Sequence, residues 1–266
     1  MDITPLELLL SAISGILVGF MLGLIGGGGS IIAIPLLLYF VGIHNVHYVI
    51  GTTALAVGIN AYINFLVHRH RTRVNTKAGV LFSIIGVIGV LAGSSLGLFT
   101  NSSSLLFLFS FLMMGIGVMM FVGKNGNDSV NQPENVQEKS GRKYRKVGIF
   151  SMLTGFASGF FGIGGGFLIV PALMYSAELG IGEAIGTSLF VVGTFGIVTA
   201  IRYGMSGDLI LSVSLLYVIG GILGGVIGTR ISTGMKRSKL RKIFSVVVIM
   251  VGIYVLFRTF NFLQFL

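Results

Sequence analysis

The chain contains no cysteine, and charged residues make up only 10% of its 266 residues. The missing cysteine excludes disulfides, thiolate metal sites and sulfur-relay chemistry. A soluble domain carries about 25% charged residues, so this chain lacks the polar surface needed to face water on all sides. Instead, 54% of its residues are hydrophobic and 41 are glycine. Apolar runs of about 18 residues or more, with glycines that let helices approach closely, predict a bundle of membrane helices.

Basic residues outnumber acidic ones by 18 to 8, and they are clustered. Four lie in residues 69–77, six in 124–146 and six in 230–242. Basic clusters between apolar spans are the usual signal of cytoplasmic loops, so we do not expect nucleic-acid binding. The N-terminus has neither a basic stretch nor a small-residue cleavage pattern, and we expect it to be structural, not a signal peptide.

The sequence also repeats itself. Residues Gly23–Tyr39 match Gly159–Tyr175 at an offset of 136, with Pro35 and Pro171 at the same place in each copy. Two further matches follow in order: Ile50–Thr53 with Ile185–Ser188, and Gly89, Gly93 and Gly97 with Gly220, Gly224 and Gly228. We therefore predict two related transmembrane halves, residues 1–122 and 147–266, joined by a polar cytoplasmic linker at 123–146.

Each half is predicted to contain five apolar helical elements. They lie at 6–25, 31–43, 49–67, 79–98 and 104–122, and at 147–161, 167–179, 184–201, 209–229 and 243–260. The first two elements of the second half are too short for a full crossing at 1.5 Å per residue. Joined by glycines, they suggest a hairpin that turns inside the membrane, where protein or a polar cavity must cover irregular backbone.

Charge placement favours an inverted arrangement of the halves. If each pair of short elements returns to its starting side, or crosses twice, the basic loops at 68–77, 123–146 and 230–242 share one side. A single broken crossing per pair would put 230–242 outside, against the positive-inside rule. We predict an all-α polytopic membrane protein of two inverted repeats, each opened by a Gly-rich broken or re-entrant helical hairpin.

The glycine runs are the first candidates for a substrate site. Glycine allows backbone N–H groups to approach a ligand, and a helix beginning at about Ile31 or Phe167 offers free N–H groups and a dipole that favour an anion. The alternative is that the glycines only permit a turn or tight packing, but their duplication favours a site. No Gly-Lys-Ser/Thr follows either run, so a nucleotide phosphate loop is not expected. The candidates are Gly27, Gly28, Gly29 and Ser30, and Gly164, Gly165 and Gly166.

Several polar residues within the apolar elements are further candidates. The hydroxyls of Thr52, Thr53, Thr187 and Ser188 either donate to a substrate oxygen or bond to the backbone. Asn60 is a candidate substrate contact; with Asn64 it shares one helix face, which equally suits interhelical hydrogen bonding. The three spaced glycines near the end of each half are expected to be packing seams.

Titratable residues give no sign of an enzyme. His44 and His47 lie in a short loop without a neighbouring carboxylate and are poor metal ligands. Glu178, Glu183 and Asp208 fall near predicted helix ends. With no nucleophile–base cluster and no carboxylate deep in a span, we expect no catalytic residue, no metal and no cofactor.

Residues 162–171 (GIGGGFLIVP) and Gly186-Thr-Ser-Leu189 resemble the TauE/SafE family of sulfite exporters and related permeases. The first-half copy at 26–35 and 51–54 is a looser match, and the resemblance extends over the whole chain. It implies a multi-pass protein of the bacterial inner membrane that carries sulfite, sulfoacetate or another sulfur- or carboxylate-bearing anion. Ser30 stands where the second half has Gly166, so the site need not be symmetric.

These features lead to a functional prediction. An anion leaving a cell that is negative inside gains about 2.3 kcal/mol per charge per 100 mV, and no buried carboxylate is evident for ion coupling. We predict a uniporter-like or channel-like exporter of a small oxyanion. The alternatives are a proton- or sodium-coupled anion uptake permease and a non-transport membrane assembly subunit. The expected partners are a small anionic substrate and the lipid bilayer; a homo-oligomer is left open.

Overall fold

The computed structural model describes residues 3–69, 74–122, 140–232 and 237–263, and within these ranges the chain is helical with no strand. The first half forms α1 (Pro5–Ile25), the 3-10 helix η1 (Gly26–Ile32), α2 (Ala33–Pro35), the π-helix η2 (Leu36–Val41), α3 (Val46–Arg69), α4 (Thr76–Phe99) and α5 (Ser102–Val122). The second half forms α6 (Ser140–Phe161), α7 (Gly166–Ser176), α8 (Ile181–Met205), α9 (Leu211–Ser232) and α10 (Arg237–Leu263). Every predicted element is thus present.

Six described helices, α1, α3, α4, α5, α8 and α9, are long and apolar enough to cross a membrane. Their spans of 20 to 24 residues reach roughly 30–36 Å, which matches a hydrocarbon core of about 30 Å. The expectation of an all-α polytopic membrane protein is confirmed. Residues 70–73, 123–139 and 233–236, which include most of the predicted linker and parts of two basic loops, lie outside the described residues.

Local signals fix several helix ends. Thr4 and Glu7 form a reciprocal capping pair at the start of α1: the Thr4 N–H donates to Glu7 Oε2 over 2.8 Å, and the Glu7 N–H donates to Thr4 Oγ1 over 3.3 Å. Pro5 takes the first helical position, where its missing N–H costs nothing. Asn75 caps α4 by accepting from the Ala78 N–H at 3.0 Å.

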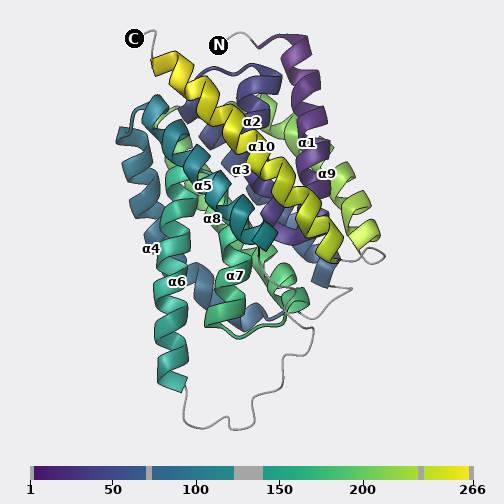
Figure 1. Ribbon diagram of the computed structural model, residues 1–266, viewed down its shortest axis with the longest axis vertical. Helices are drawn as coiled ribbons and strands as arrows, with labels where there is room; N and C mark the ends of the chain where they lie inside the picture. The colour runs from purple at the N-terminus through teal and green to yellow at the C-terminus, as the bar shows by residue number, and fades with distance from the viewer. Residues whose placement is uncertain (1–2, 70–73, 123–139, 233–236, 264–266) are drawn as a thin grey trace.

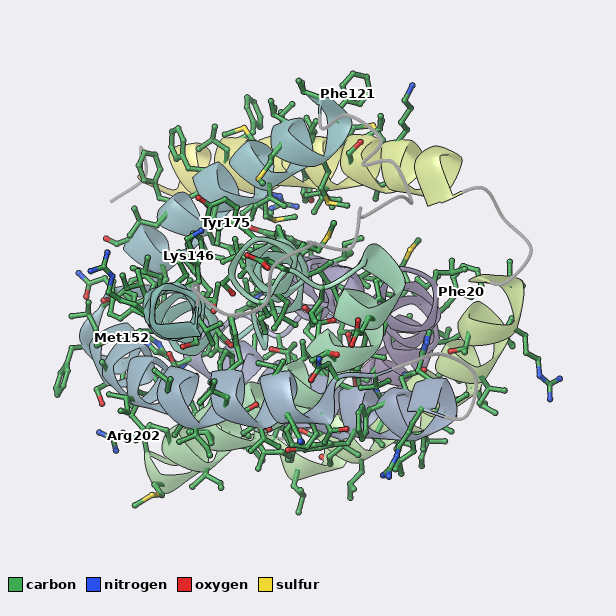
Figure 2. All side chains as sticks on the ribbon, turned by 90° about the horizontal axis from the view of Figure 1, so that it is seen from below. Phe20, Phe121, Lys146, Met152, Tyr175 and Arg202 are labelled. Atoms are coloured by element: carbon green, nitrogen blue, oxygen red, sulfur yellow. The ribbon has the colours of Figure 1, made fainter. Side chains whose placement is uncertain are left out.

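The helices pack around a central antiparallel pair, α3 and α8, which are the most buried of the six spans. α9 and then α1 pack beyond α3, while α4 and then α6 pack beyond α8. Figures 1 and 2 show α5 and α10 side by side on one face of the bundle. The outer helices carry large exposed apolar side chains, as lipid contact requires.

Glycines form the contacts between the outer helices and their partners. A Cβ placed on Gly93 of α4 would fall on the carbonyl oxygen of Phe156 in α6, and one on Gly224 of α9 would fall on the carbonyl of Ile16 in α1. The other predicted seam glycines are equally close to backbone or side chains of the facing helix: Gly89, Gly97, Gly220 and Gly228. Their predicted role in helix packing is confirmed.

Most basic residues of the described helices gather at one end of the bundle; Arg202 and Arg258 lie near the ends of α8 and α10, toward the other end. α1 runs parallel to α9, because Gly15, Gly19 and Gly23 meet successive turns of α9, and α4 runs parallel to α6 in the same way. The start of α1 and the end of α10 lie together at one end (Figure 1). The opposite end, here called the basic end, carries the end of α3, the start of α4, the start of α6 and the end of α9, with Arg69, Lys77, Arg145, Lys146 and Arg230.

Three element predictions need correction. α6 is 22 residues long rather than the 15 of the predicted 147–161 segment, because its basic first turns continue the helix beyond the apolar run. α10 is 27 residues long and begins at Arg237 rather than at residue 243, because its basic first turns are helical too. The predicted helix at 31–43 is not a single α-helix but η1, α2 and η2 in succession. Four consecutive glycines are poor α-formers, and Pro35 has no N–H to donate, so the regular α hydrogen-bond ladder is interrupted on both sides.

Candidate functional site

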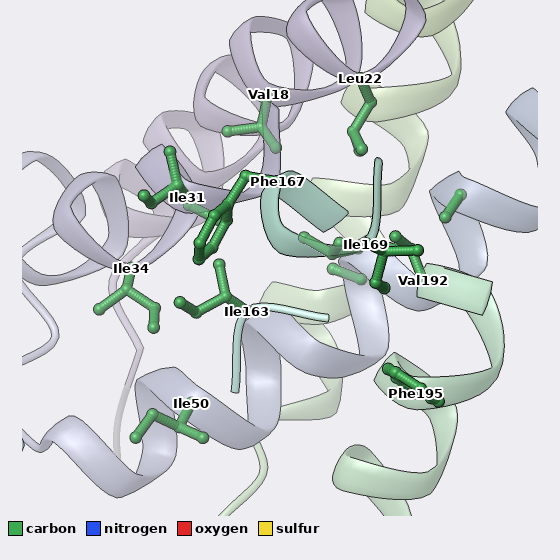
Figure 3. Packing of buried hydrophobic residues seen from close by; sticks show 14 of the residues in the cluster. Val18, Leu22, Ile31, Ile34, Ile50, Ile163, Phe167, Ile169, Val192 and Phe195 are labelled. Atoms are coloured by element: carbon green, nitrogen blue, oxygen red, sulfur yellow. The ribbon is translucent and has the colours of Figure 1, made fainter. Parts of the chain in front are cut away.

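The two short hairpin segments of the chain meet inside the bundle, where η1 packs against α7. Figure 3 shows Ile31 from η1 close to Phe167 from α7 and to Ile163 just before it. All three side chains are buried, at 6% exposure or less. The two glycine-rich segments thus contact each other, and their contact is apolar.

The second glycine run forms a tight buried loop between α6 and α7. Gly162, Gly164 and Gly165 have φ values of 67°, 68° and 65°, a left-handed conformation that costs other residues about 1–2 kcal/mol each. There is also no room for a side chain at these positions. A Cβ on Gly164 would lie 3.0 Å from Val192 Cγ1, and one on Gly165 would lie 2.8 Å from Ser158 Cβ. Both backbone conformation and packing require glycine here.

The loop presents the beginning of α7 to the interior. The N–H groups of Leu168 and Ile169 both donate to the Gly165 carbonyl, at 2.9 and 3.0 Å. The N–H groups of Gly166 and Phe167 precede these and belong to the first turn, which has no acceptor within its own helix. Together with the helix dipole, they favour a negative ligand at this position.

Ser158 of α6 adds a hydroxyl to this helix start. Its side chain is fully buried, and its Oγ has no hydrogen-bond partner among the described residues. It lies 3.2 Å from the position that a Gly165 Cβ would take. Buried hydroxyls are usually hydrogen-bonded, so an unpaired one beside free N–H groups marks a polar site suited to an oxyanion.

The first glycine run is arranged differently. Gly27 and Gly28 lie in η1; a Cβ on Gly29 would lie 2.5 Å from the Leu22 nitrogen, and Ser30 is fully buried. The helix expected to begin at about Ile31 does not begin there, because η1 runs directly into α2. Of the two helix starts expected after the glycine runs, the one near Phe167 is present at α7, and the one near Ile31 is not found in the described chain.

The hydroxyl candidates hold the ends of α3 and α8 to neighbouring helices. Thr52 Oγ1 accepts from the N–H of Ile210, and Thr187 Oγ1 accepts from the N–H of Asn75, each at 3.0 Å. These bonds leave the two hydroxyl protons free to donate. In contrast, the hydroxyl proton of Thr53 goes to the Val49 carbonyl at 2.7 Å, and that of Ser188 goes to the Ile185 carbonyl at 2.8 Å.

Asn60 and Asn64 point from α3 toward α9, against Gly221 and Gly225. Asn64 Nδ2 donates to the Asn60 carbonyl at 2.9 Å, and Thr229 Oγ1 donates to Asn64 Oδ1 at 3.4 Å. This confirms interhelical hydrogen bonding for Asn64. Asn60 is fully buried, and neither amide atom has a partner among the described residues.

Among the titratable candidates, His47 contacts the end of α4, and the others are at least partly exposed. His47 Nε2 is 3.3 Å from the Gly97 carbonyl and 3.2 Å from that of Thr100, and His44 is exposed. Four carboxylates fall within the described ranges, and none of them is buried: Glu7, Glu178, Glu183 and Asp208.

The sequence alone did not single out Ser158. It is one serine in an apolar run, and the matching position of the first half is Leu22, so the internal repeat does not mark it. Its burial without a partner could be recognised only from the fold.

A bundle of described helices that includes six long apolar spans, with its two glycine-rich segments in contact, is the fold of a polytopic membrane protein. A family model described as "Sulfite exporter TauE/SafE" matches residues 11–255. The chain therefore belongs to the TauE/SafE family of membrane transporters.

The chain is similar over nearly its whole length to curated relatives. A "Probable membrane transporter protein" of Xylella fastidiosa (strain 9a5c) is 44% identical over 248 residues, covering 92% of this chain and 94% of the relative. The "Probable membrane transporter protein YunE" of Bacillus subtilis (strain 168) is 25% identical over 260 residues, covering 92% and 95%. No solved structure matches the chain.

Proposed function

We propose that the protein exports a small oxyanion, most suitably sulfite, a sulfonate or a related sulfur oxyanion, across the bacterial cytoplasmic membrane. The observation that carries the proposal is the start of α7, where Ser158 Oγ lies buried and unpaired beside the left-handed glycine loop. The family name points to the same chemistry, since its model is described as a sulfite exporter.

The site suits a small anion on electrostatic grounds. The first N–H groups of α7 and its helix dipole carry positive partial charge, the buried Ser158 hydroxyl is close to this helix start, and burial strengthens such interactions. No carboxylate of the described residues is buried to repel an anion. The oxygens of a sulfite or sulfonate group accept several hydrogen bonds at once, so they can use several donors of this kind.

We further propose that the two halves, residues 1–122 and 147–266, are inverted repeats. The matching hydrogen bonds of Thr52 and Thr187 support this, because donors and acceptors are both 135 residues apart. The pairing of α1 with α9 and of α6 with α4 supports it too, as does the antiparallel crossing of α3 and α8. Transporters built this way place their substrate between the repeats.

Under this proposal the basic end faces the cytoplasm, because cytoplasmic loops carry the excess of Lys and Arg. The proposed substrate contacts are those that the sequence suggests, with Ser158 as the one added by the structure. The complete proposed set is Gly27, Gly28, Gly29, Ser30, Thr52, Thr53, Asn60, Ser158, Gly164, Gly165, Gly166, Thr187 and Ser188.

Flux measurements on purified protein in proteoliposomes test the function. Sulfite, sulfonates and small carboxylates are loaded, and efflux is compared with that of protein-free liposomes. Ser158→Ala is expected to reduce efflux of the best substrate about tenfold, the effect of roughly 1.4 kcal/mol, which is typical for a lost hydrogen bond to a charged group. Ser151→Ala is the matched control: Ser151 is also buried on α6, but its hydroxyl donates to the Gly148 carbonyl at 2.9 Å.

Equal efflux from Ser158→Ala and Ser151→Ala would remove Ser158 from the site. Efflux no faster than in protein-free liposomes for every anion would overturn the proposed function itself.

A further inference from the structure

The contact between α3 and α9 has a different chemistry from its counterpart between α8 and α4. On one side, the Asn60 amide lies against Gly221: a Cβ placed on that glycine would be 2.5 Å from Asn60 Cγ. At the positions 135 residues away, the ring of Phe195 lies against Gly86, where a Cβ would be 2.7 Å from Phe195 Cε1. At equivalent positions, one half therefore has an amide and the other has a phenyl ring.

Packing alone therefore does not explain Asn60. The equivalent position shows that this fold accepts an aromatic side chain there, whereas the Asn60 amide is fully buried with both polar atoms unpartnered. A buried polar group without a partner destabilises a protein. Such a group points to a ligand that supplies the missing hydrogen bonds.

Polar groups continue from Asn60 toward the basic end. Asn64 lies one turn further along α3, and its amide oxygen accepts from Thr229 of α9 at 3.4 Å. One more turn brings His68, whose Nε2 is 3.4 Å from the Gly23 carbonyl of α1. Asn60, Asn64, His68 and Thr229 are here called the polar seam. The next residues along α3 and α9 are Arg69 and Arg230, in the last turns of their helices.

In the other direction, the polar seam approaches the glycine loop. Val57 precedes Asn60 by three residues, so the two occupy neighbouring positions on the surface of α3. A Cβ on Gly164 would be 3.5 Å from Val57 Cγ1, so the loop lies against this turn of α3. The polar seam thus links the basic end with the candidate anion site.

The equivalent positions of the other half make no such polar line. Thr199 stands in the place of Asn64, and its hydroxyl donates to the backbone carbonyl of Phe195 at 2.8 Å. Tyr203 stands in the place of His68 and is fully buried; its hydroxyl has no partner among the described residues, but no amide lies at the position of Asn60 to continue a polar line from it. An aromatic side chain therefore occupies two of these three positions.

We propose that the polar seam is the route by which the anion passes between the basic end and the glycine loop, with the Asn60 Nδ2–H groups donating to it on the way. This inference rests on the proposed function. Arg69 and Arg230, at the basic end of the polar seam, raise the local concentration of anions. A fixed buried cation would trap an anion, whereas an uncharged amide donor binds it and can release it. The phenyl ring of Phe195 leaves the opposite half without an equivalent route.

Transport kinetics test the role of Asn60. With sulfite as the probe, Asn60→Leu in proteoliposomes is expected to raise the half-saturating concentration at least tenfold. Asn60→Asp is expected to be slower still, because a carboxylate repels the anion. Phe195→Leu and Thr199→Val are the matched controls and should stay within twofold of wild type. Sulfite kinetics of Asn60→Leu within twofold of wild type, or faster flux in Asn60→Asp, would overturn the proposal.

A labelling experiment is independent of flux and of whether the leucine variant folds. Because the chain has no cysteine, Asn60→Cys and Phe195→Cys each provide a single thiol. In open membrane fragments, a methanethiosulfonate reagent carrying a sulfonate group should modify Asn60→Cys at least tenfold faster than Phe195→Cys. Equal rates would refute the route. If wild-type protein moves no anion yet the labelling differs as expected, the proposed function fails and the polar seam stands.

Discussion

Thr52 accepts a hydrogen bond of 3.0 Å from the backbone N–H of Ile210, although 158 residues separate them in the chain. Thr187 repeats this relationship with Asn75 at the same distance. In both cases a buried threonine near the start of a central helix holds the backbone where an outer span begins. The agreement between halves lies in tertiary contacts as well as in sequence, which supports a duplicated architecture.

Thr52→Val and Thr187→Val are expected to destabilise the protein by similar amounts. Each change leaves a backbone N–H without its acceptor, at a cost of about 1–3 kcal/mol. For a chain of this size, this lowers the melting temperature by roughly 2–4 °C per kcal/mol. Thermal unfolding in detergent measures the effect, with Thr52→Ser and Thr187→Ser as controls that keep the acceptor. A valine variant as stable as its serine partner would contradict the structural role.

The glycines at the contacts of α4 with α6 and of α9 with α1 should tolerate no added methyl group. Gly93→Ala and Gly224→Ala place a Cβ on a backbone carbonyl of the facing helix, so the helices must separate or the protein must unfold. Gly115→Ala on α5 is the control, because no atom lies within 4 Å of its Cβ position. We expect the first two variants to lose monodisperse protein during detergent extraction and Gly115→Ala to be at least as stable as wild type, since alanine favours helix. Gly93→Ala that is extracted as monodisperse protein would show that the contact between α4 and α6 adjusts to the added methyl group.

The parts of this fold that could be predicted from the sequence are the helices formed by long hydrophobic runs. Spans such as α4 and α9 are long, apolar and bounded by polar residues, so the predicted segments differ from these helices only by up to three residues at either end. The start of α6 was missed because Ser140–Lys146 is basic and reads as a loop, although it continues a helix. The 3-10 and π character of η1 and η2 arises around Gly26–Gly29 and Pro35, and the hydrophobic periodicity does not reveal it.

The candidate site was predictable only in part. The duplicated glycines correctly marked the two segments that meet at the centre. The partners of Thr52 and Ser158 could not be inferred, because they depend on contacts between distant segments. The difference between Asn60 and Phe195 is visible in the sequence as a mismatch within the repeat, but only the shared contact with a glycine of the neighbouring helix shows that they occupy equivalent places.

The orientation of the basic end can be tested with single cysteines. Lys77→Cys and Lys146→Cys, at the basic end, should resist a membrane-impermeant maleimide added to intact cells and react after permeabilisation. Thr100→Cys lies in the loop between α4 and α5 at the opposite end and should react from outside. Rapid labelling of Lys77→Cys in intact cells would reverse the proposed orientation.

Gly165→Ala should impair transport more than it impairs folding. The φ of 65° costs alanine about 1–2 kcal/mol, and its methyl group would push against Ser158 at the beginning of α7. We expect sulfite flux to fall at least tenfold while the protein remains monodisperse in detergent. Gly148→Ala, on α6 with open space around its Cβ position, is the control and should transport normally. Near-normal flux in Gly165→Ala would place the anion elsewhere.

The last prediction concerns the driving force. In the described part of the chain, Glu178, Glu183 and Asp208 lie near helix ends and none is buried, so an anion held by N–H groups and hydroxyls meets no carboxylate that must first take up a proton or sodium. Its movement should follow its own electrochemical gradient, with an electrical contribution of about 2.3 kcal/mol per charge per 100 mV. A potassium-diffusion potential in proteoliposomes should therefore drive sulfite flux without any pH or sodium gradient. Reversing the potential should reverse the favoured direction. Flux that ignores the potential but follows a pH gradient, and loses that dependence in Glu183→Gln, would establish proton coupling instead.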